Sequence, residues 1–190
     1  MKRVFIIHGW DGYLDEGWFP WLKRELEKKG FQVYIPAMPN PAEPIIKSWV
    51  SFLSKTVGDV DKETFFVGHS IGCQAIMRYF ETLPDNKRVG GVVFVAGWFT
   101  LSDLETDEDR RVARPWVETP VNFQKVKSIG RNFTYIFSDN DPVVPTSNRD
   151  IFREKLDSKI LVEHNKGHIG GADGITELLS VLGAILNFVK

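Results

Sequence analysis

The stretch of sequence that most constrains the fold is Gly68-His69-Ser70-Ile71-Gly72, because it joins two segments of different character. Before it lies the apolar run Phe65-Phe66-Val67, which is typical of a buried strand. After it, residues 73–77 are typical of a helix. A strand that turns into a helix at one residue strains that residue and brings neighbouring backbone close. The two glycines leave room for this approach, so we expect a sharp turn that lifts Ser70 clear of a sheet.

Short apolar runs alternate with helical patterns along the rest of the chain. The runs that indicate buried strands cover residues 3–8, 31–36, 64–68, 89–96, 132–138 and 159–163. Helical patterns are found at residues 18–26, 46–53, 75–83, 151–156 and 175–189. This alternation predicts an α/β fold with a parallel sheet. A chain of 190 residues is long enough for one substantial core, so we expect a single domain over residues 1–190.

Charge and cysteine content disfavour several classes of protein. The 24 Lys and Arg residues nearly balance the 25 Asp and Glu residues, so we expect neither a nucleic acid nor a membrane as partner. Cys73 is the only cysteine, which excludes an intrachain disulfide and favours a reducing compartment. The apolar run at residues 4–7 is too short for the core of a signal peptide. We therefore expect a soluble, cytoplasmic protein.

Residues 97–120 show no clear periodicity, which predicts a long loop. This segment carries the charged cluster SDLETDEDRR together with Trp98, Phe99 and Trp116. It is expected either to cover a substrate pocket or to form a surface excursion with one aromatic anchor. Asp103, Glu105, Asp107 and Asp109 alternate like calcium ligands but lack the glycine and glutamate of a calcium loop, so we expect a solvated charged face.

Ser70 can act as a nucleophile if a base accepts its proton and a carboxylate orients that base. After such a strand-turn-helix serine, the carboxylate and then the histidine are expected to follow in chain order. The run at 132–138 leads into Asp139 and Asp141, and the run at 159–163 is followed by His168 in a glycine-bounded loop. We favour Asp141, because Pro142 stiffens its backbone, whereas Asp139 directly follows the strand and is expected to be fixed by turn hydrogen bonds.

Acyl chemistry at Ser70 would also need donors for the developing oxyanion. The backbone N–H groups of Ile71 and Trp10 are the expected donors, and Trp10, Trp98 and Phe99 are the expected residues of the substrate pocket. The histidines form no metal-binding motif, and the residues after the first strand match no nucleotide-binding loop. We therefore expect neither a metal nor another cofactor.

Four motifs, FIIHGW, VGHSIG, SDNDPVVP and KGHIGG, together resemble the small serine-hydrolase family that includes retinoblastoma-binding protein 9. The resemblance runs from the first strand to the last helix. It implies a minimal α/β-hydrolase fold, with roughly six parallel strands in the order 2-1-3-4-5-6 and helices on both faces. It also implies Ser70, Asp141 and His168 as a catalytic triad. The retinoblastoma-binding motif Leu-x-Cys-x-Glu is absent around Cys73, so that binding role is not expected.

The expected activity is hydrolysis of a small-molecule ester with a small or medium acyl group, through an acyl-enzyme on Ser70. The same machinery would serve a thioesterase, an amidase or an acyltransferase. A second alternative is a non-enzymatic protein-binding module on a hydrolase fold, since a fold alone does not guarantee activity.

Overall fold

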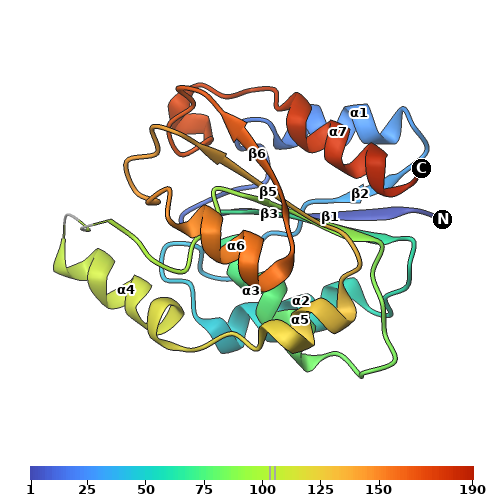
Figure 1. The fold of residues 1–190 in the computed structure, drawn as a ribbon, viewed down its shortest axis with the longest axis horizontal. Helices are drawn as coiled ribbons and strands as arrows, with labels where there is room; N and C mark the ends of the chain where they lie inside the picture. The colour runs from blue at the N-terminus through green and yellow to red at the C-terminus, as the bar shows by residue number, and fades with distance from the viewer. Residues whose placement is uncertain (103, 105) are drawn as a thin grey trace.

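A parallel β-sheet forms the centre of the protein (Figure 1). The computed structural model describes residues 1–102, 104 and 106–190. The strands are β1 (Arg3–Ile7), β2 (Gln32–Tyr34), β3 (Thr64–His69), β4 (Gly91–Val95), β5 (Phe133–Ser138) and β6 (Lys159–Glu163). Neighbouring strands pair in parallel in the order β2-β1-β3-β4-β5-β6, which confirms the predicted topology.

Helices cover both faces of the sheet, as Figure 1 shows. Helices α1 (Phe19–Glu27) and α7 (Leu179–Phe188) lie on one face, and α2 (Ile46–Val57), α3 (Ile71–Thr82), α5 (Phe123–Ile129) and α6 (Asn148–Leu156) lie on the other. Successive strand residues point to opposite faces, so β1 supplies Phe5 and Ile7 to one core and Val4 and Ile6 to the other. Each such buried side chain contributes about 1.5–3 kcal/mol of hydrophobic stabilisation. No described helix has the length and apolar character to cross a bilayer.

The segment 97–120 differs from expectation, because it contains helix α4 (Asp107–Glu118). Thr106 and Asp109 form a capping box at its start, and Val112, Ala113 and Trp116 form its buried stripe. The prediction of a structureless loop was wrong because Pro115 and the charged cluster obscured this short apolar stripe. Asp107 and Asp109 belong to the first turn, where acidic side chains complement the helix dipole. Asp103 and Glu105 lie outside the described residues.

The turn between β3 and α3 has the strain and crowding expected from the sequence. Ser70 adopts φ 54° and ψ −124°, a region that a residue with a side chain rarely occupies. A Cβ atom at Gly68 would lie 2.8 Å from the backbone nitrogen of Cys73. At Gly72 it would lie 2.4 Å from the carbonyl oxygen of Ile7. Helix α3 begins directly after Ser70, before the helical pattern predicted at residues 75–83, and its first turn presses against the end of β1.

Substituting Gly72→Ala should push α3 away from β1, because the new methyl group would overlap a backbone carbonyl that cannot move aside. Overpacking of this kind should lower the free energy of unfolding by about 1–3 kcal/mol, measured by denaturant titration. Gly183→Ala in α7 is the matched control, because a Cβ there meets no atom within 4 Å. That control should raise stability by about 0.5–1 kcal/mol. Equal stability of the two variants would contradict the close approach at Gly72.

Candidate active site

The loops that follow all six strands meet at the carboxyl end of the sheet, where ligands of parallel α/β sheets usually bind. A cavity of about 380 Å³ opens there. Its walls combine Ser70 and His168 with mostly apolar side chains and three carboxylates: Trp10, Asp11, Ala42, Trp98, Leu101, Leu104, Glu108, Asp109, Val112 and Val143. A larger cavity of about 640 Å³ lies at the amino ends of β5 and β6, away from these residues. Its lining includes none of the predicted site residues, so the smaller cavity is the candidate active site.

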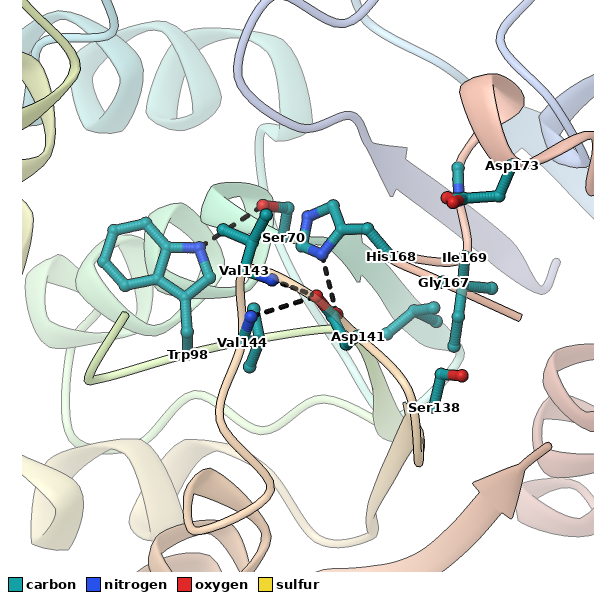
Figure 2. A network of polar contacts seen from close by, with 12 residues as sticks. Ser70, Trp98, Ser138, Asp141, Val143, Val144, Gly167, His168, Ile169 and Asp173 are labelled. Atoms are coloured by element: carbon teal, nitrogen blue, oxygen red, sulfur yellow. Dashed lines mark hydrogen bonds and ion pairs between the residues drawn. The ribbon is translucent and has the colours of Figure 1, made fainter. Parts of the chain in front are cut away.

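His168 lies between Ser70 and Asp141, with one ring nitrogen facing each of them (Figure 2). Its Nδ1–H donates to Oδ2 of Asp141 over 2.8 Å. This bond fixes the tautomer in which Nε2 is free to accept a proton, and Nε2 is the nitrogen that faces the serine. The geometry thus supplies a hydroxyl, a base and an orienting carboxylate in the order that acyl transfer requires.

The carboxylate of Asp141 is held rigidly, since its side chain is 2% exposed. Its Oδ1 accepts hydrogen bonds from the backbone N–H groups of Val143 and Val144, over 2.8 and 2.9 Å. Its Oδ2 is thereby left to His168 (Figure 2). Because both acceptor positions are occupied by fixed donors, the aspartate can hold the imidazole in one orientation.

Asp139 has a different set of partners. Its Oδ2 accepts from Nδ1 of His164 over 2.6 Å, and its Oδ1 accepts from the N–H of Asn165 over 2.9 Å. The hydrogen bond from Asn165, followed by that from His164, holds the pKa of Asp139 below its ordinary value. Asp139 therefore fixes the start of the loop after β6, as its position directly after β5 suggested.

A second group of contacts ties the Asp141 loop to the His168 loop. The hydroxyl of Ser138 accepts from the N–H of Lys166, and Oδ1 of Asn140 accepts from the N–H of Gly167, each over 2.9 Å. Gly167 has φ 55°, and a Cβ there would lie 2.0 Å from a carboxylate oxygen of Asp173. The sequence alone did not predict that Ser138 and Asn140 support the His168 loop. The four consecutive polar residues Ser138-Asp139-Asn140-Asp141 were the feature of the sequence from which this support could have been predicted.

His69 supports the same loop from the other side. Its Nε2–H donates to the carbonyl oxygen of His168 over 2.9 Å. Burial, together with the neighbouring His168, lowers the pKa of His69 to about 3, so the ring is neutral and keeps the proton that this bond needs. His69 therefore positions the backbone of His168.

The two expected oxyanion donors belong to the residue after Ser70 and to a residue of the cavity wall. Ile71 is the first residue of α3, so its N–H has no partner within the helix. The carbonyl of Gly9 accepts from His8 Nδ1 over 2.8 Å and from Gly12 N–H over 3.2 Å, which fixes the peptide that carries the Trp10 N–H. Burial lowers the pKa of His8, and its Nε2 accepts from the N–H of Met38, so His8 is the neutral tautomer that donates from Nδ1.

The three predicted pocket residues separate in the structure. Trp10 and Trp98 line the cavity, and the indole Nε1–H of Trp10 donates to the carbonyl oxygen of Ala42 over 2.9 Å. Phe99 points elsewhere: its ring packs against Phe123 and Phe152, with centroids 5.2 and 4.9 Å away. The position of Phe99 therefore does not support the expected pocket role, because the aromatic cluster under α5 and α6 holds its ring.

Comparison with known proteins gives this site a family. Residues 4–185 match the serine hydrolase family model. The chain therefore belongs to the serine hydrolase family, and its fold is that of an α/β hydrolase.

Individual relatives resemble nearly the whole chain. YdeN of Bacillus subtilis (strain 168) is 30% identical over 188 residues, which cover 98% of this chain and 96% of that protein. The serine hydrolase RBBP9 of Rattus norvegicus is 29% identical, with 90% of this chain and 87% of the relative covered. The crystal structure of YdeN has a TM-score of 0.90 and covers 100% of this chain and 99% of its own. Est1E from Butyrivibrio proteoclasticus is 14% identical with a TM-score of 0.72, and the match covers 99% of this chain and 88% of Est1E. Est1E therefore shares the fold.

Asp141→Asn should leave the fold intact and lower kcat for ester hydrolysis by up to about 10⁴-fold, because the amide would favour the wrong tautomer of His168. Asp139→Asn is the matched control and should lose much less activity. Since the folded pKa of Asp139 is lowered, its contacts stabilise the fold at neutral pH, and this stabilisation is lost as the pH falls through that pKa. The control should therefore melt at a lower temperature at neutral pH, with a smaller difference in acid. An active Asp141→Asn beside an inactive, folded Asp139→Asn would reverse the assignment.

Proposed function

We propose that this protein hydrolyses small-molecule esters, with Ser70 as nucleophile, His168 as base and Asp141 as the residue that orients the base. One observation carries the proposal. Ser70, on a strained turn, and His168, bonded to a buried carboxylate, line the same cavity. Strained backbone persists where the surrounding structure enforces it, and it is common at active sites.

The proposed reaction has two steps. In the first, Ser70 Oγ attacks the ester carbonyl carbon while its proton passes to His168 Nε2. The N–H groups of Trp10 and Ile71 stabilise the oxyanion of the tetrahedral intermediate. His168 then protonates the departing alcohol, which leaves an acyl group on Ser70. In the second step, a water molecule gives its proton to His168 and attacks the acyl carbon. The bond between that carbon and Ser70 Oγ then breaks, His168 returns the proton to the serine, and the acid is released.

The cavity supports a small or medium, uncharged acyl group. Its volume of about 380 Å³ lies near the lower end of the range for ligand pockets. Leu101, Val112 and Val143 give it apolar walls, while its carboxylates, Asp11 among them, would repel a negatively charged acyl chain. Thioesters, amides and acyl transfer to another acceptor would use the same residues. A non-enzymatic binding module would not need the hydrogen bond to Asp141 that fixes the tautomer of His168.

A fluorophosphonate probe should label the protein once, and Ser70→Ala should abolish that labelling. Loss of this hydroxyl should also lower kcat by about 10⁶-fold and leave a small residual rate from the oxyanion donors. Thermal melting of the variant should match that of the unmodified protein. Labelling that survives in Ser70→Ala would exclude Ser70 as the nucleophile.

A panel of p-nitrophenyl esters of graded chain length would locate the preferred acyl group, and matched thioesters and amides would separate the alternative activities. Val112→Phe in α4 should shift the preference to shorter chains, because Val112 lines the cavity. Crowding by the larger side chain should reduce kcat/KM for the longest accepted ester by about 10-fold or more. Val117→Phe on the exposed face of α4 is the control and should keep the original profile. The same shift in both variants would argue against Val112 as a pocket wall.

A further inference from the structure

The indole of Trp98 contacts the serine hydroxyl. Its Nε1–H donates to Oγ of Ser70 over 3.3 Å, as Figure 2 shows. Both residues are buried, since Trp98 is 2% exposed and Ser70 is 8% exposed. Because so little of the indole surface is exposed, it can make only a small contact with an acyl chain. Its N–H, which points at Ser70, therefore indicates a function other than lining the pocket.

Buried side chains fix the backbone of Trp98 from two directions. The hydroxyl of Tyr135 donates to the carbonyl oxygen of Gly97 over 2.9 Å. The amide of Gln74, in α3, donates to the carbonyl oxygen of Trp98 over 3.0 Å. Gln74 is in turn held by Arg78, whose guanidinium donates to its Oε1 over 2.9 Å. The helix that starts at the nucleophile therefore also positions Trp98.

Asn148 completes this support from helix α6. Its Oδ1 accepts from the N–H groups of Phe99 and Thr100, over 2.7 and 3.1 Å. Its Nδ2 donates to the carbonyl oxygen of Thr100 over 2.9 Å. Asn148 is 0% exposed, so breaking these bonds would leave buried polar groups without partners. The indole is thus held in a preorganised position beside Ser70.

We propose that Trp98 is a further catalytic residue, whose indole N–H stabilises negative charge on Ser70 Oγ. The inference rests on the proposed role of Ser70 as the nucleophile. An indole nitrogen can donate a hydrogen bond but cannot accept one, so it occupies a lone pair of Oγ and leaves the hydroxyl proton for His168. No proton leaves the indole at any stage. A hydrogen bond to a charged oxygen is about twice as strong as one to a neutral oxygen, so it strengthens as the proton passes to His168.

The same donor acts again in the second step of the reaction. When the tetrahedral intermediate of deacylation collapses, the bond between the acyl carbon and Oγ breaks and Oγ takes the electron pair. The Trp98 N–H stabilises that charge until His168 returns a proton to the serine. Both steps pass through a state with charge on Oγ, so the interaction is stronger in the transition state than in the ground state and should act on kcat.

The test replaces Trp98 by Phe, which keeps an aromatic ring and removes the N–H. The rate of fluorophosphonate labelling and kcat should each fall about 10- to 100-fold, with KM nearly unchanged. Trp116→Phe is the matched control, because its indole is also buried but donates to the carbonyl oxygen of Pro44. The control should keep the labelling rate and kcat within about twofold of the unmodified protein. Equal losses in both variants, or a normal labelling rate in folded Trp98→Phe, would overturn the proposal.

A second measurement does not depend on the folding of Trp98→Phe or on catalysis. In ¹⁵N spectra of the chain, which has six tryptophans, the Trp98 indole resonance should move upfield in Ser70→Ala, where its acceptor is missing. The Trp116 resonance should stay in place. An unmoved Trp98 resonance would show that the hydrogen bond is absent in solution and would overturn the proposal. Labelling of Ser70→Ala by the probe would instead overturn the proposed function itself.

Discussion

The candidate site depends on how closely helix α3 approaches the end of β1. A Cβ at Gly72 would lie 2.4 Å from the carbonyl oxygen of Ile7 and 2.6 Å from that of His8, so the two backbones are in contact. This contact brings the start of α3 up to the loop after β1, where a Cβ at Gly9 would lie 3.3 Å from the Cβ of Ser70. The positive φ of Ser70 carries a strain of about 1–3 kcal/mol. Its N–H is held by the carbonyl oxygen of Val95 over 2.9 Å, so the central strands keep the turn in place.

Much of the fold could be predicted because its strands are buried on both faces and therefore form continuous apolar runs. All six observed strands lie within or at the edge of the predicted ranges, and chain order then determined how the carboxyl ends would meet. Helix α4 escaped prediction for a physical reason. Its stability depends on Val112 and Trp116 packing against the molecule and on a capping box, and neither gives a long periodic pattern. Tertiary contacts, and not local propensity, decide that this segment is helical.

In the site too, some residues could be predicted from the sequence and others depend on tertiary contacts. Ser70, Asp141 and His168 could be predicted to come together because each follows a recognisable strand, and the choice of Asp141 over Asp139 followed from their distances from the end of β5. The adjacent aromatic residues Trp98 and Phe99 point to different places: Trp98 contacts Ser70, whereas Phe99 packs against Phe152. Nothing in the local sequence distinguishes the two. Asn148, far along the chain, holds the backbone of Phe99 and thereby orients both rings. Contacts between distant residues of this kind leave little trace in one sequence.

The four histidines of the chain differ in what their ring nitrogens contact. His8 uses both ring nitrogens in backbone contacts, and His69 is buried with one nitrogen bonded to a carbonyl oxygen. His164 pairs with Asp139, but its side chain is 74% exposed, so water competes for it. His168 alone among the four combines a buried carboxylate partner with a place in the wall of the cavity. In His168 one ring nitrogen is bound to a buried carboxylate while the other faces Ser70, which is the arrangement that the proposed general base requires. Residue type alone could not have shown this difference among the histidines.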